Sequence, residues 1–486
     1  MGQQITDYFL YKWRYILGYG FIGISVVALF ILAGLFIPGG ITQSEMNSAV
    51  MSKAISFSPD TFNAESIINL PFHLLQRASM WAFGVTNFSI KFPAMLLALF
   101  SALGMLLLLR TWFKRNVAVL TTILVITTGQ FLFIAQNGTP SIMYVFTSVW
   151  LLFAAMMISR RARFSGVWKL VLFGIAATSL YTPLSIYVLI ALASATLLHP
   201  HLRFLVRRLS KVKLFFGTLF FLVLLAPLGY AIIKHPDIGL RLLGIPEVWP
   251  DFGANALQLV KQYFDFISSS STVPMTPVYG LGSIILIGLG VYRLTTTKYT
   301  ARSYIITIWS ILLLPALLLN PNYTSVTFIP VLLLMAMGIS TLLTSWYRLF
   351  PRNPYARFAG LIPLALLVSG MVLSGVDRYM YGYLYNPAVR ANFTNDLSLI
   401  NKELRRQKGA PVTLAVDTSE SAFYAVVAKE YKNVTLTTTP PPTTSSVIVT
   451  HAMYKKAKSA SEPTRIITDA RAKDADRFYI YKTDVK

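Results

Sequence analysis

Apolar runs long enough to cross a bilayer recur along most of this chain and set its architecture. The first extends over 23 residues, from Tyr15 to Ile37, and ends at a Pro-Gly-Gly sequence. A helix needs about twenty apolar residues to span the hydrocarbon core of a membrane. The chain is 55% hydrophobic and only 13% charged. We therefore predict a polytopic helical membrane protein with eleven crossings, at about 15–37, 92–110, 117–135, 139–159, 167–182, 183–199, 214–233, 278–293, 303–319, 324–344 and 358–376.

The basic residues give this topology an independent check. A net charge of +24 would point to a nucleic-acid partner in a soluble protein. With eleven crossings, however, twenty Lys and Arg fall on one side of the membrane, and before residue 377 only six fall on the other: Lys53, Arg77, Lys91, Lys234, Arg241 and Lys261. Because basic residues gather in cytoplasmic loops, topology explains the charge and no nucleic-acid partner is expected. We expect the protein in the plasma membrane, with a cytoplasmic N-terminus.

The sequence divides into two units. Residues 1–376 form the expected transmembrane domain, with long outer loops at 38–91 and 234–277. Residues 377–486 have the composition of a soluble domain, which an odd number of crossings places outside the cytoplasm. Helices are predicted at 392–408 and 419–431, and strands at 411–416, 434–437, 447–450 and 478–481. This pattern indicates a small extracytoplasmic α/β domain.

Carboxylates are confined to the outer segments. Between Asp7 and Asp237 the chain has three, Glu45, Asp60 and Glu65, and all three lie in the first outer loop. None of the expected spans contains a carboxylate. Ion-coupled transporters generally need ionisable groups at membrane depth, so the sequence argues against transport and directs attention to the first outer loop.

Two short helices are expected in that loop. The first follows Ser44 as N-cap and begins at Glu45, and the second extends from Pro71 to Gly84. Both are too short to cross a membrane, so we expect them to lie along its outer interface and roof the bundle. The residues predicted to form their apolar faces are Met46, Val50, Ala54 and Phe57 in the first helix, and Phe72, Leu75, Trp81 and Phe83 in the second. Polar residues, among them Glu45, Ser48, Ser52, His73, Gln76 and Arg77, fall opposite. The alternative is a pair of packing helices whose charged face is solvated.

The order of these features resembles the GT-C class of membrane glycosyltransferases, in particular the family of protein O-mannosyltransferases and bacterial aminoarabinose transferases. Gln43-Ser44-Glu45 stands where that family has an Asp-Glu pair, and Asn-Leu-Pro-Phe at 69–72 is similar to its His-Pro-Pro-Leu stretch. Ser-Ile-Lys-Phe-Pro at 89–93 stands where the family has an Arg-Leu-Pro sequence. FLFIAQNGTPS at 131–141 is similar to the family's aromatic run with an Arg and a Pro-Asp. The departures are Ser44 and Ser141 in place of acids, and Gln136 or Asn137 in place of an Arg.

The resemblance implies a catalytic role for Glu45. In the family, the acid after the first span deprotonates an acceptor hydroxyl, which attacks the anomeric carbon of a sugar and displaces a lipid phosphate. One base is enough for an inverting transfer, because the phosphate leaves already ionised. The outer cations Lys53, Arg77, Lys91, Arg241 and Lys261 are candidates to hold that phosphate, and Trp249 is a candidate to stack on the sugar, although an interfacial role also fits this residue.

A metal site is not predicted, because the chain has no cysteine and its histidines are scattered. The family has metal-dependent and metal-independent members, so a divalent metal cofactor stays open. The predicted function is transfer of a sugar from a polyprenyl-phosphate donor to a glycan, lipid or protein acceptor at the outer face. The alternative is a non-catalytic relative that acts in envelope assembly or lipid flipping, in which the loss of acids at Ser44 and Ser141 marks the loss of chemistry.

Overall fold

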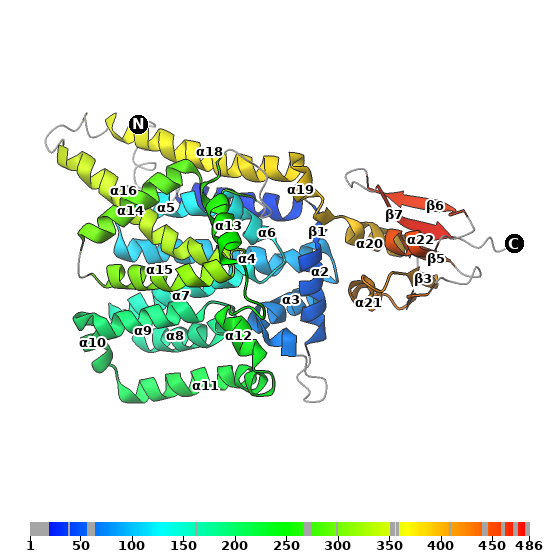
Figure 1. Ribbon diagram of the computed structural model, residues 1–486, viewed down its shortest axis with the longest axis horizontal. Coiled ribbons are helices and arrows are strands. Elements are labelled where there is room, and N and C mark those ends of the chain that lie inside the picture. Colours follow the sequence, from blue (N-terminus) through cyan, green and yellow to red (C-terminus); the bar gives the residue numbers. More distant parts are fainter. Residues whose placement is uncertain are drawn as a thin grey trace, which may run out of the picture.

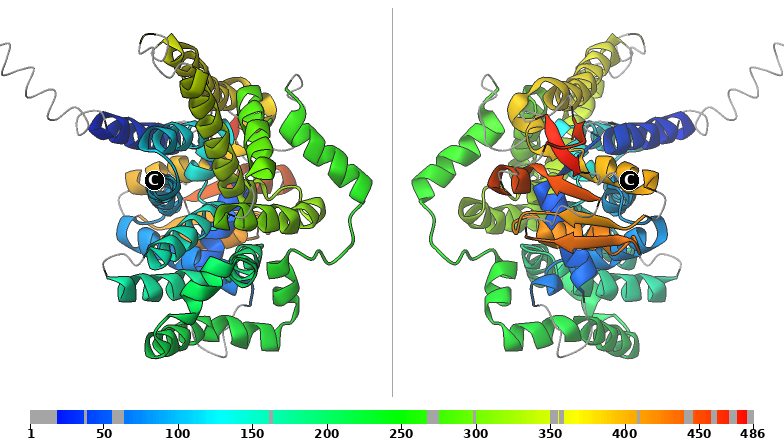
Figure 2. Two further views of the ribbon diagram at one scale, coloured as in Figure 1. Left: turned by 90° about the vertical axis from the view of Figure 1, so that its left-hand side faces the viewer. Right: turned by 90° about the vertical axis from the view of Figure 1, so that its right-hand side faces the viewer.

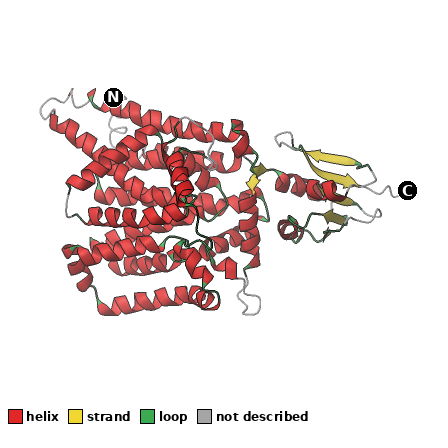
Figure 3. Ribbon diagram, in the orientation of Figure 1, coloured by secondary structure: helices red, strands yellow, loops and turns green. Residues whose placement is uncertain are grey.

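The chain forms a bundle of long helices with a small sheet domain at one end (Figures 1 and 3). The computed structural model describes residues 19–36, 39–55, 64–160, 164–266, 275–297, 300–349, 355, 359–407, 410–439, 446–457, 462–469 and 475–481. Asp60 and Phe57 of the first outer loop lie outside these ranges.

Six segments are long and apolar enough to cross a membrane: α4 (Asn87–Trp112), α7 (Ser141–Ser159), α11 (Lys211–Lys234), α15 (Ala301–Leu319), η4 with α16 (Thr324–Thr327 and Phe328–Leu349), and α18 (Leu361–Tyr385). Two bent pairs raise the number to eight if each is one span: α5 with α6 (Arg115–Ile126 and Gly129–Gln136, bent by 69°) and α9 with α10 (Ile186–Leu198 and Pro200–Arg207, bent by 95°). The polytopic helical membrane fold is thereby confirmed.

Three shorter apolar helices occupy the other predicted spans: residues 19–34, α8 (Ser165–Ser179) and α14 (Leu281–Thr296). The first of these continues into a short π-helical turn, η1 (Leu32–Phe36). All eleven predicted segments are thus largely helical in the described residues, although a count of eleven crossings stays a prediction. The proposed domain boundary at residue 377 lies inside α18.

Glycines allow some of these helices to approach closely. A Cβ on Gly290 of α14 would overlap the backbone carbonyl of Leu334 in α16, and one on Gly338 of α16 would overlap that of Leu286 in α14. Small residues at such crossings let helix backbones meet inside a membrane, where packing rather than the hydrophobic effect drives association.

Four short helices connect the spans at the end of the bundle that carries the sheet domain. These are α2 (Gln43–Ala54), α3 (Leu70–Phe83), α12 (Asp237–Leu243) and α13 (Phe252–Phe264), with the short η3 turn (Ala64–Ile67) before α3. The predicted end of α3 at Gly84 is confirmed, since Gly84 is its C-cap at φ 68°. The predicted N-cap of α2 is wrong: Thr42 is the cap, and Ser44 lies inside the first turn.

The predicted apolar faces of α2 and α3 are buried only in part: Met46 and Phe72 are buried, but most of the other apolar residues are not. The residues that α3 buries are Leu70, Phe72, His73, Gln76, Ser79 and Met80, and α2 buries Glu45, Met46, Ser48, Ala49 and Ser52. Trp81 is 86% exposed, and Leu75 and Phe83 are exposed as well. The two helices meet through their polar sides, which satisfy each other's hydrogen bonds, and leave an apolar side free to face lipid. The alternative of a solvated charged face is excluded for Glu45.

The C-terminal domain holds a five-stranded mixed sheet in the order β4-β3-β5-β7-β6. Its strands are β3 (Val412–Ala415), β4 (Val434–Thr437), β5 (Val447–Thr450), β6 (Arg465–Thr468) and β7 (Asp476–Tyr481). Its helices are α20 (Asp396–Arg406), α21 (Ser421–Ala428) and α22 (His451–Ala457), and α19 (Pro387–Arg390) leads into the domain. The small α/β domain is confirmed, while β6 and α22 were not predicted.

This domain packs directly on α2 and α3. Strands β1 (Ile41–Thr42) and β2 (Phe393–Thr394) pair in antiparallel fashion. A single apolar cluster joins Ile41, Met46, Met80, Val85 and Ile90 to Leu397, Ile400 and Leu404 of α20 and to the sheet. Seen from the sheet end, the strands lie in front of the blue helices α2 and α3 (Figure 2). The C-terminal domain is therefore part of the surroundings of the first outer loop.

Candidate functional site

Glu45 stands at the centre of the candidate site, in the first turn of α2. It closes a capping box with Thr42: the Glu45 N–H donates to Thr42 Oγ1 at 3.2 Å, and the Thr42 N–H donates to Glu45 Oε2 at 2.7 Å. Free N–H groups in the first turn of a helix favour a carboxylate there. The sequence that starts the helix therefore also fixes the position of the Glu45 side chain.

The second carboxylate oxygen of Glu45 reaches the turn between α6 and α7. Glu45 Oε1 accepts a hydrogen bond from the Gly138 N–H at 2.7 Å and lies 3.9 Å from Lys91 Nζ. Glu45 is 0% exposed and Lys91 is 1% exposed. Two backbone bonds and a nearby ammonium group stabilise a carboxylate where an isolated charge would be strongly unfavourable. Glu45 is thus an enclosed and paired carboxylate.

Lys91 enters the site from α4 and connects three further elements. Its ammonium group donates to Gln136 Oε1 at 2.8 Å, at the end of α6, and lies 5.6 Å from the centre of the Phe393 ring in β2. The segments that carry the family resemblance, 43–45, 89–93 and 131–141, therefore meet at one point. Gln136 occupies the place for which an Arg was expected, and it accepts a hydrogen bond where an Arg would add a second cation.

Gly138 is needed because two backbones come close together. A Cβ at this position would lie 2.7 Å from the carbonyl oxygen of Ile90 and 2.8 Å from the Ile90 side chain. Because the residue has no side chain, the turn after α6 can press against α4 and aim its N–H at Glu45.

Gln76 of α3 ties this centre to the roof helices. Its Nε2 donates to the carbonyl oxygens of Ile90 at 3.0 Å and Gly138 at 2.8 Å, and its Oε1 accepts from the hydroxyls of Ser48 at 2.9 Å and Ser52 at 2.6 Å. The side chain is fully buried. A buried amide with all its positions occupied fixes the mutual placement of α2, α3, α4 and the turn after α6.

His73 extends the same network. Its Nδ1 lies 2.9 Å from Ser52 Oγ, and the Ser52 hydroxyl also lies within reach of two acceptors, Gln76 Oε1 and the Ser48 carbonyl. A hydroxyl has one proton to give, so this arrangement favours Nδ1–H of His73 as the donor to Ser52. Burial lowers the pKa of His73 from 6.5 to about 4. The histidine is therefore neutral at physiological pH.

Of the five cations predicted to hold a phosphate, Lys91 is the one that lies beside Glu45. Lys53 instead pairs with Glu430 of the C-terminal domain at 2.9 Å. Arg77 donates to the carbonyl oxygen of Ile55 at 2.6 Å, and Arg241 forms an exposed ion pair with Glu247 at 2.7 Å.

The remaining predicted contacts lie on the second outer segment. Lys261 on α13 is exposed, and Trp249 before α13 is 66% exposed with its ring 6.1 Å from that of Phe252. Asp251, two residues after Trp249, caps α13 by accepting from the N–H groups of Gly253 and Ala254. The green segment of α12 and α13 stands at one side of the bundle in Figure 2. These side chains are free to meet a ligand there, at a distance from the enclosed Glu45.

The chemistry available at the centre is that of one carboxylate and one amine among neutral amides and hydroxyls. Within the described ranges, no three His, Asp or Glu side chains come together in a way that could hold a metal ion. For Glu45 to act on a substrate, its Oε1 must give up the Gly138 N–H, so the turn at 137–140 would have to move.

Sequence reasoning missed the residues that enclose Glu45. Ser48, Ser52 and Gln76 were assigned to the polar faces of their helices with no partner predicted, and Gly138 and Thr42 were given no role. The available signal was the serine spacing of four on α2, opposite a second helix with His and Gln three residues apart. Two polar stripes of that kind can pair with each other as readily as with water.

No protein-family model matches the chain, and no curated protein matches its sequence significantly. The solved structures that it resembles are GT-C membrane glycosyltransferases. One is ArnT from Cupriavidus metallidurans bound to undecaprenyl phosphate, with a TM-score of 0.57 and 10% sequence identity over 96% of this chain and 98% of that chain. The apo state of ArnT matches over the same shares, with a TM-score of 0.53 and 12% identity.

A second protein of this class is also similar. The archaeal oligosaccharyltransferase AglB from Archaeoglobus fulgidus, in complex with an inhibitory peptide and a dolichol-phosphate, has a TM-score of 0.51 and 12% identity over 86% of this chain and 64% of that chain. The fold of the present chain is therefore ArnT-like and GT-C. At these identities the narrower assignment to the O-mannosyltransferase and aminoarabinose transferase family stays a prediction.

Proposed function

We propose that the protein is a glycosyltransferase that moves a sugar from a polyprenyl-phosphate donor to an acceptor at the end of the bundle that carries the C-terminal domain. The observation that carries this proposal is the shared fold with ArnT bound to undecaprenyl phosphate, which extends over nearly the full length of both chains. AglB, which holds dolichol-phosphate, has the same class of fold. A fold alone does not define a reaction, so the proposal also rests on Glu45 and Lys91.

In the proposed reaction, Glu45 takes the proton of the acceptor hydroxyl as its oxygen attacks the anomeric carbon. A glycosidic C–O bond forms, the C–O bond to the phosphate breaks, and its electron pair leaves with the polyprenyl phosphate. Lys91, whose ammonium lies 3.9 Å from Glu45 Oε1, is the candidate to stabilise the negative charge that develops on the departing phosphate. Arg241, Lys261 and Trp249 stay candidates for outer contacts to donor or acceptor.

Substrate entry must open the site, because Glu45 is fully enclosed. The weakest barrier is the single hydrogen bond from the Gly138 N–H, since the capping bond to Thr42 uses the other oxygen. We expect the turn at 137–140 to move when a donor binds, which would free Oε1 and leave the helix cap intact.

The test is Glu45→Gln in cells that lack the gene, scored by the glycan or glycolipid that disappears on deletion. We expect the restoring activity to fall by about a hundredfold or more, as for loss of a general base. Glu462→Gln is the control, because it removes an exposed carboxylate of the C-terminal domain. The melting temperature in detergent shows whether Glu45→Gln has kept the fold, and Lys91→Gln provides a second loss of activity if it has not.

The non-catalytic alternative is favoured by one observation: both oxygens of Glu45 already bond backbone N–H groups, and the side chain is 0% exposed. In that case Glu45 serves only to join α2 to the turn after α6. Full restoration of the glycan by a well-folded Glu45→Gln protein would support this alternative and refute the catalytic proposal.

A further inference from the structure

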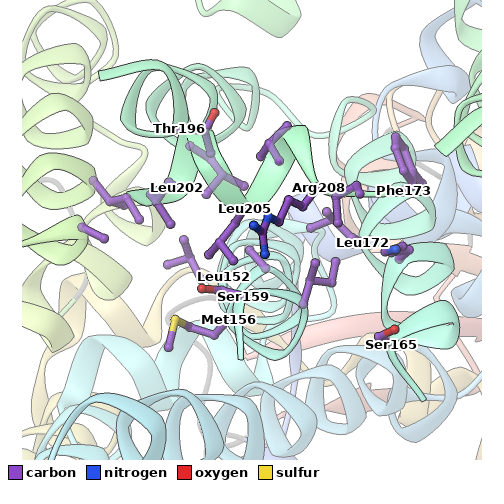
Figure 4. A pocket seen from close by; sticks show the side chains of 18 of the residues that line it. Leu152, Met156, Ser159, Ser165, Leu172, Phe173, Thr196, Leu202, Leu205 and Arg208 are labelled. Atoms are coloured by element: carbon purple, nitrogen blue, oxygen red, sulfur yellow. The ribbon is translucent and has the colours of Figure 1, made fainter. Parts of the chain in front are cut away.

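A second candidate binding site lies at the opposite end of the bundle from the sheet domain. A cavity of about 410 Å³ opens there between α7, α8, α9, α10 and the first turns of α11 and α15. Figure 1 places α10 at this end, and Figure 4 shows the cavity itself. None of its lining residues belongs to the Glu45 network, so it is separate from the candidate glycosyltransferase site.

The lining of this cavity suits an amphiphile. Most of the wall is apolar and comes from residues such as Leu152, Met156, Leu172, Phe173, Leu202 and Leu205. Three hydroxyl groups, on Ser159, Ser165 and Thr196, and two cations, Lys169 and Arg208, complete it. A free inorganic anion would leave the apolar wall uncovered, whereas a lipid would cover it and bring a head group to the polar atoms.

Among the described residues, neither of these two cations has an acidic partner. Lys169 is 9% exposed, and within the described part of the chain its ammonium group has no hydrogen-bond or ion-pair partner. The Arg208 guanidinium lies 4.2 Å from the centre of the Phe204 ring, and Figure 4 shows it directed into the cavity near Leu205 and Ser159. All lining residues come from stretches 66–236 and 266–376, which contain no Asp or Glu. Arg208 is exposed at the rim, whereas the enclosed ammonium of Lys169 calls for an anion from outside the protein.

The helix at the rim of the cavity indicates where that anion comes from. α10 turns by 95° from α9 and buries none of its residues. It begins a basic stretch with Arg203, Arg207, Arg208, Lys211 and Lys213, while Phe204 and Val206 are about half exposed at 49% each. A basic amphipathic helix that crosses the end of a bundle lies in the membrane interface and attracts anionic lipid.

We propose that this cavity binds one anionic glycerophospholipid, whose phosphate is neutralised by Lys169 and Arg208 and whose acyl chain covers the apolar wall. The lipid ties α10 to the starts of α8 and α11. Charge complementarity selects an anionic head group over a zwitterionic one, and the short apolar wall fits part of one acyl chain. The proposal does not depend on the glycosyltransferase function.

The test is lipid retention by the purified full-length protein, measured by native mass spectrometry with phosphatidylglycerol, phosphatidylcholine or undecaprenyl phosphate added at equal concentration. We expect preferential retention of one phosphatidylglycerol, and a loss of about fivefold in that retention for Lys169→Gln or Arg208→Gln, since each cation near a lipid phosphate is worth about 1 kcal/mol. Arg207→Gln is the matched control: it removes the same charge one residue away, from a position that does not line the cavity.

A cavity-filling variant separates this site from general surface attraction. Leu205→Trp keeps every charge and occupies the space, so we expect it to lose phosphatidylglycerol as the charge variants do. The proposal is overturned if Arg207→Gln loses as much as Arg208→Gln, if Leu205→Trp retains the lipid, or if phosphatidylcholine or undecaprenyl phosphate is retained in preference.

Discussion

Gln76 is a single residue that fixes the positions of the elements around Glu45. Its two N–H bonds and two accepted O–H bonds reach three other segments: α4, the turn after α6, and α2. A polar network inside a protein is stable only when its members are all paired, because each unpaired group costs about 1–3 kcal/mol. The neutral side chains Gln76, Ser48 and Ser52 thus hold the position of a charged pair without adding charge to it.

His73 makes the stability of the protein depend on pH. Burial lowers its pKa from 6.5 to about 4, so below pH 6.5 the unfolded chain takes up a proton that the folded protein refuses. The stability is fully present above pH 6.5 and is lost as the pH falls toward 4, by an amount of about 3 kcal/mol. We expect the melting temperature in detergent to fall over this range, and to fall less for His73→Asn.

The control for this prediction is His235→Asn, because His235 is exposed. Carboxylates that become protonated over the same range affect all three proteins alike, so the difference between wild type and His73→Asn is the quantity of interest. Parallel melting curves for wild type and His73→Asn from pH 7 to pH 4 would show that His73 is not the group responsible.

At the scale of secondary-structure elements, the sequence pattern of α2 and α3 predicts that the helices exist but does not predict which face each helix buries. Their existence follows from helical periodicity, and the ends of α3 follow from Pro71 and Gly84. Their orientation does not follow, because at a membrane boundary an apolar face can turn to lipid as readily as to the bundle. The contact between the two helices determines their orientation: serines of α2 form hydrogen bonds with the His and Gln of α3, and the apolar Trp81 stays exposed.

The contact between α4 and the turn after α6 is narrow enough to test with one methyl group. In Gly138→Ala the new Cβ would stand 2.7 Å from the Ile90 carbonyl oxygen, so the turn must shift and the N–H that binds Glu45 must shift with it. We expect a loss of about 1–3 kcal/mol in stability, as for other overpacked sites, seen as a lower melting temperature.

Gly229→Ala is the matched control for this variant. Gly229 lies inside α11, and a Cβ there would have no atom within 4 Å, so alanine should leave stability unchanged or raise it slightly through helix propensity. Equal melting temperatures for Gly138→Ala and wild type would mean that the turn has room to adjust and does not fix the position of Glu45.

At the scale of the whole molecule, the outer helices and the C-terminal domain share one apolar core. Ile400 of α20 is fully buried in the cluster that contains Ile41, Met46 and Met80. An aspartate there would be a buried charge without a partner, which costs about 3 kcal/mol or more. We expect Ile400→Asp to separate the domain from the bundle, measured as faster release of a C-terminal fragment in limited proteolysis.

Ser398→Asp serves as the control, since Ser398 is exposed in the first turn of the same helix and an acid there is favourable. Its cleavage rate should match that of wild type. If Ile400→Asp is also cleaved at the wild-type rate, the cluster does not hold the two units together.

The overall arrangement was predictable to the extent that it depends on long, repeated signals. Apolar runs gave the helical segments, and the change of composition near residue 377 indicated a separate soluble domain. The sharp bend after α5 was not predicted, because apolar residues on both sides of Thr127 and Thr128 were assigned to one span at 117–135. The bend after α9 lies at His199, where the predicted span ends, but the short helix α10 beyond it was not predicted. The short β6 and α22 have too few residues for a period to be recognised.

The pairing of β1 with β2 also has a consequence for biosynthesis. Ile41 and Thr42 emerge from the ribosome early, and their partners Thr394 and Phe393 follow roughly 350 residues later, which at about 5–20 residues per second is tens of seconds. Phe393 is also the ring beside the Lys91 ammonium. The nascent protein therefore holds the Glu45 carboxylate without these neighbours until residues 393 and 394 have been made, so the surroundings of Glu45 are completed long after its own helix has been synthesised.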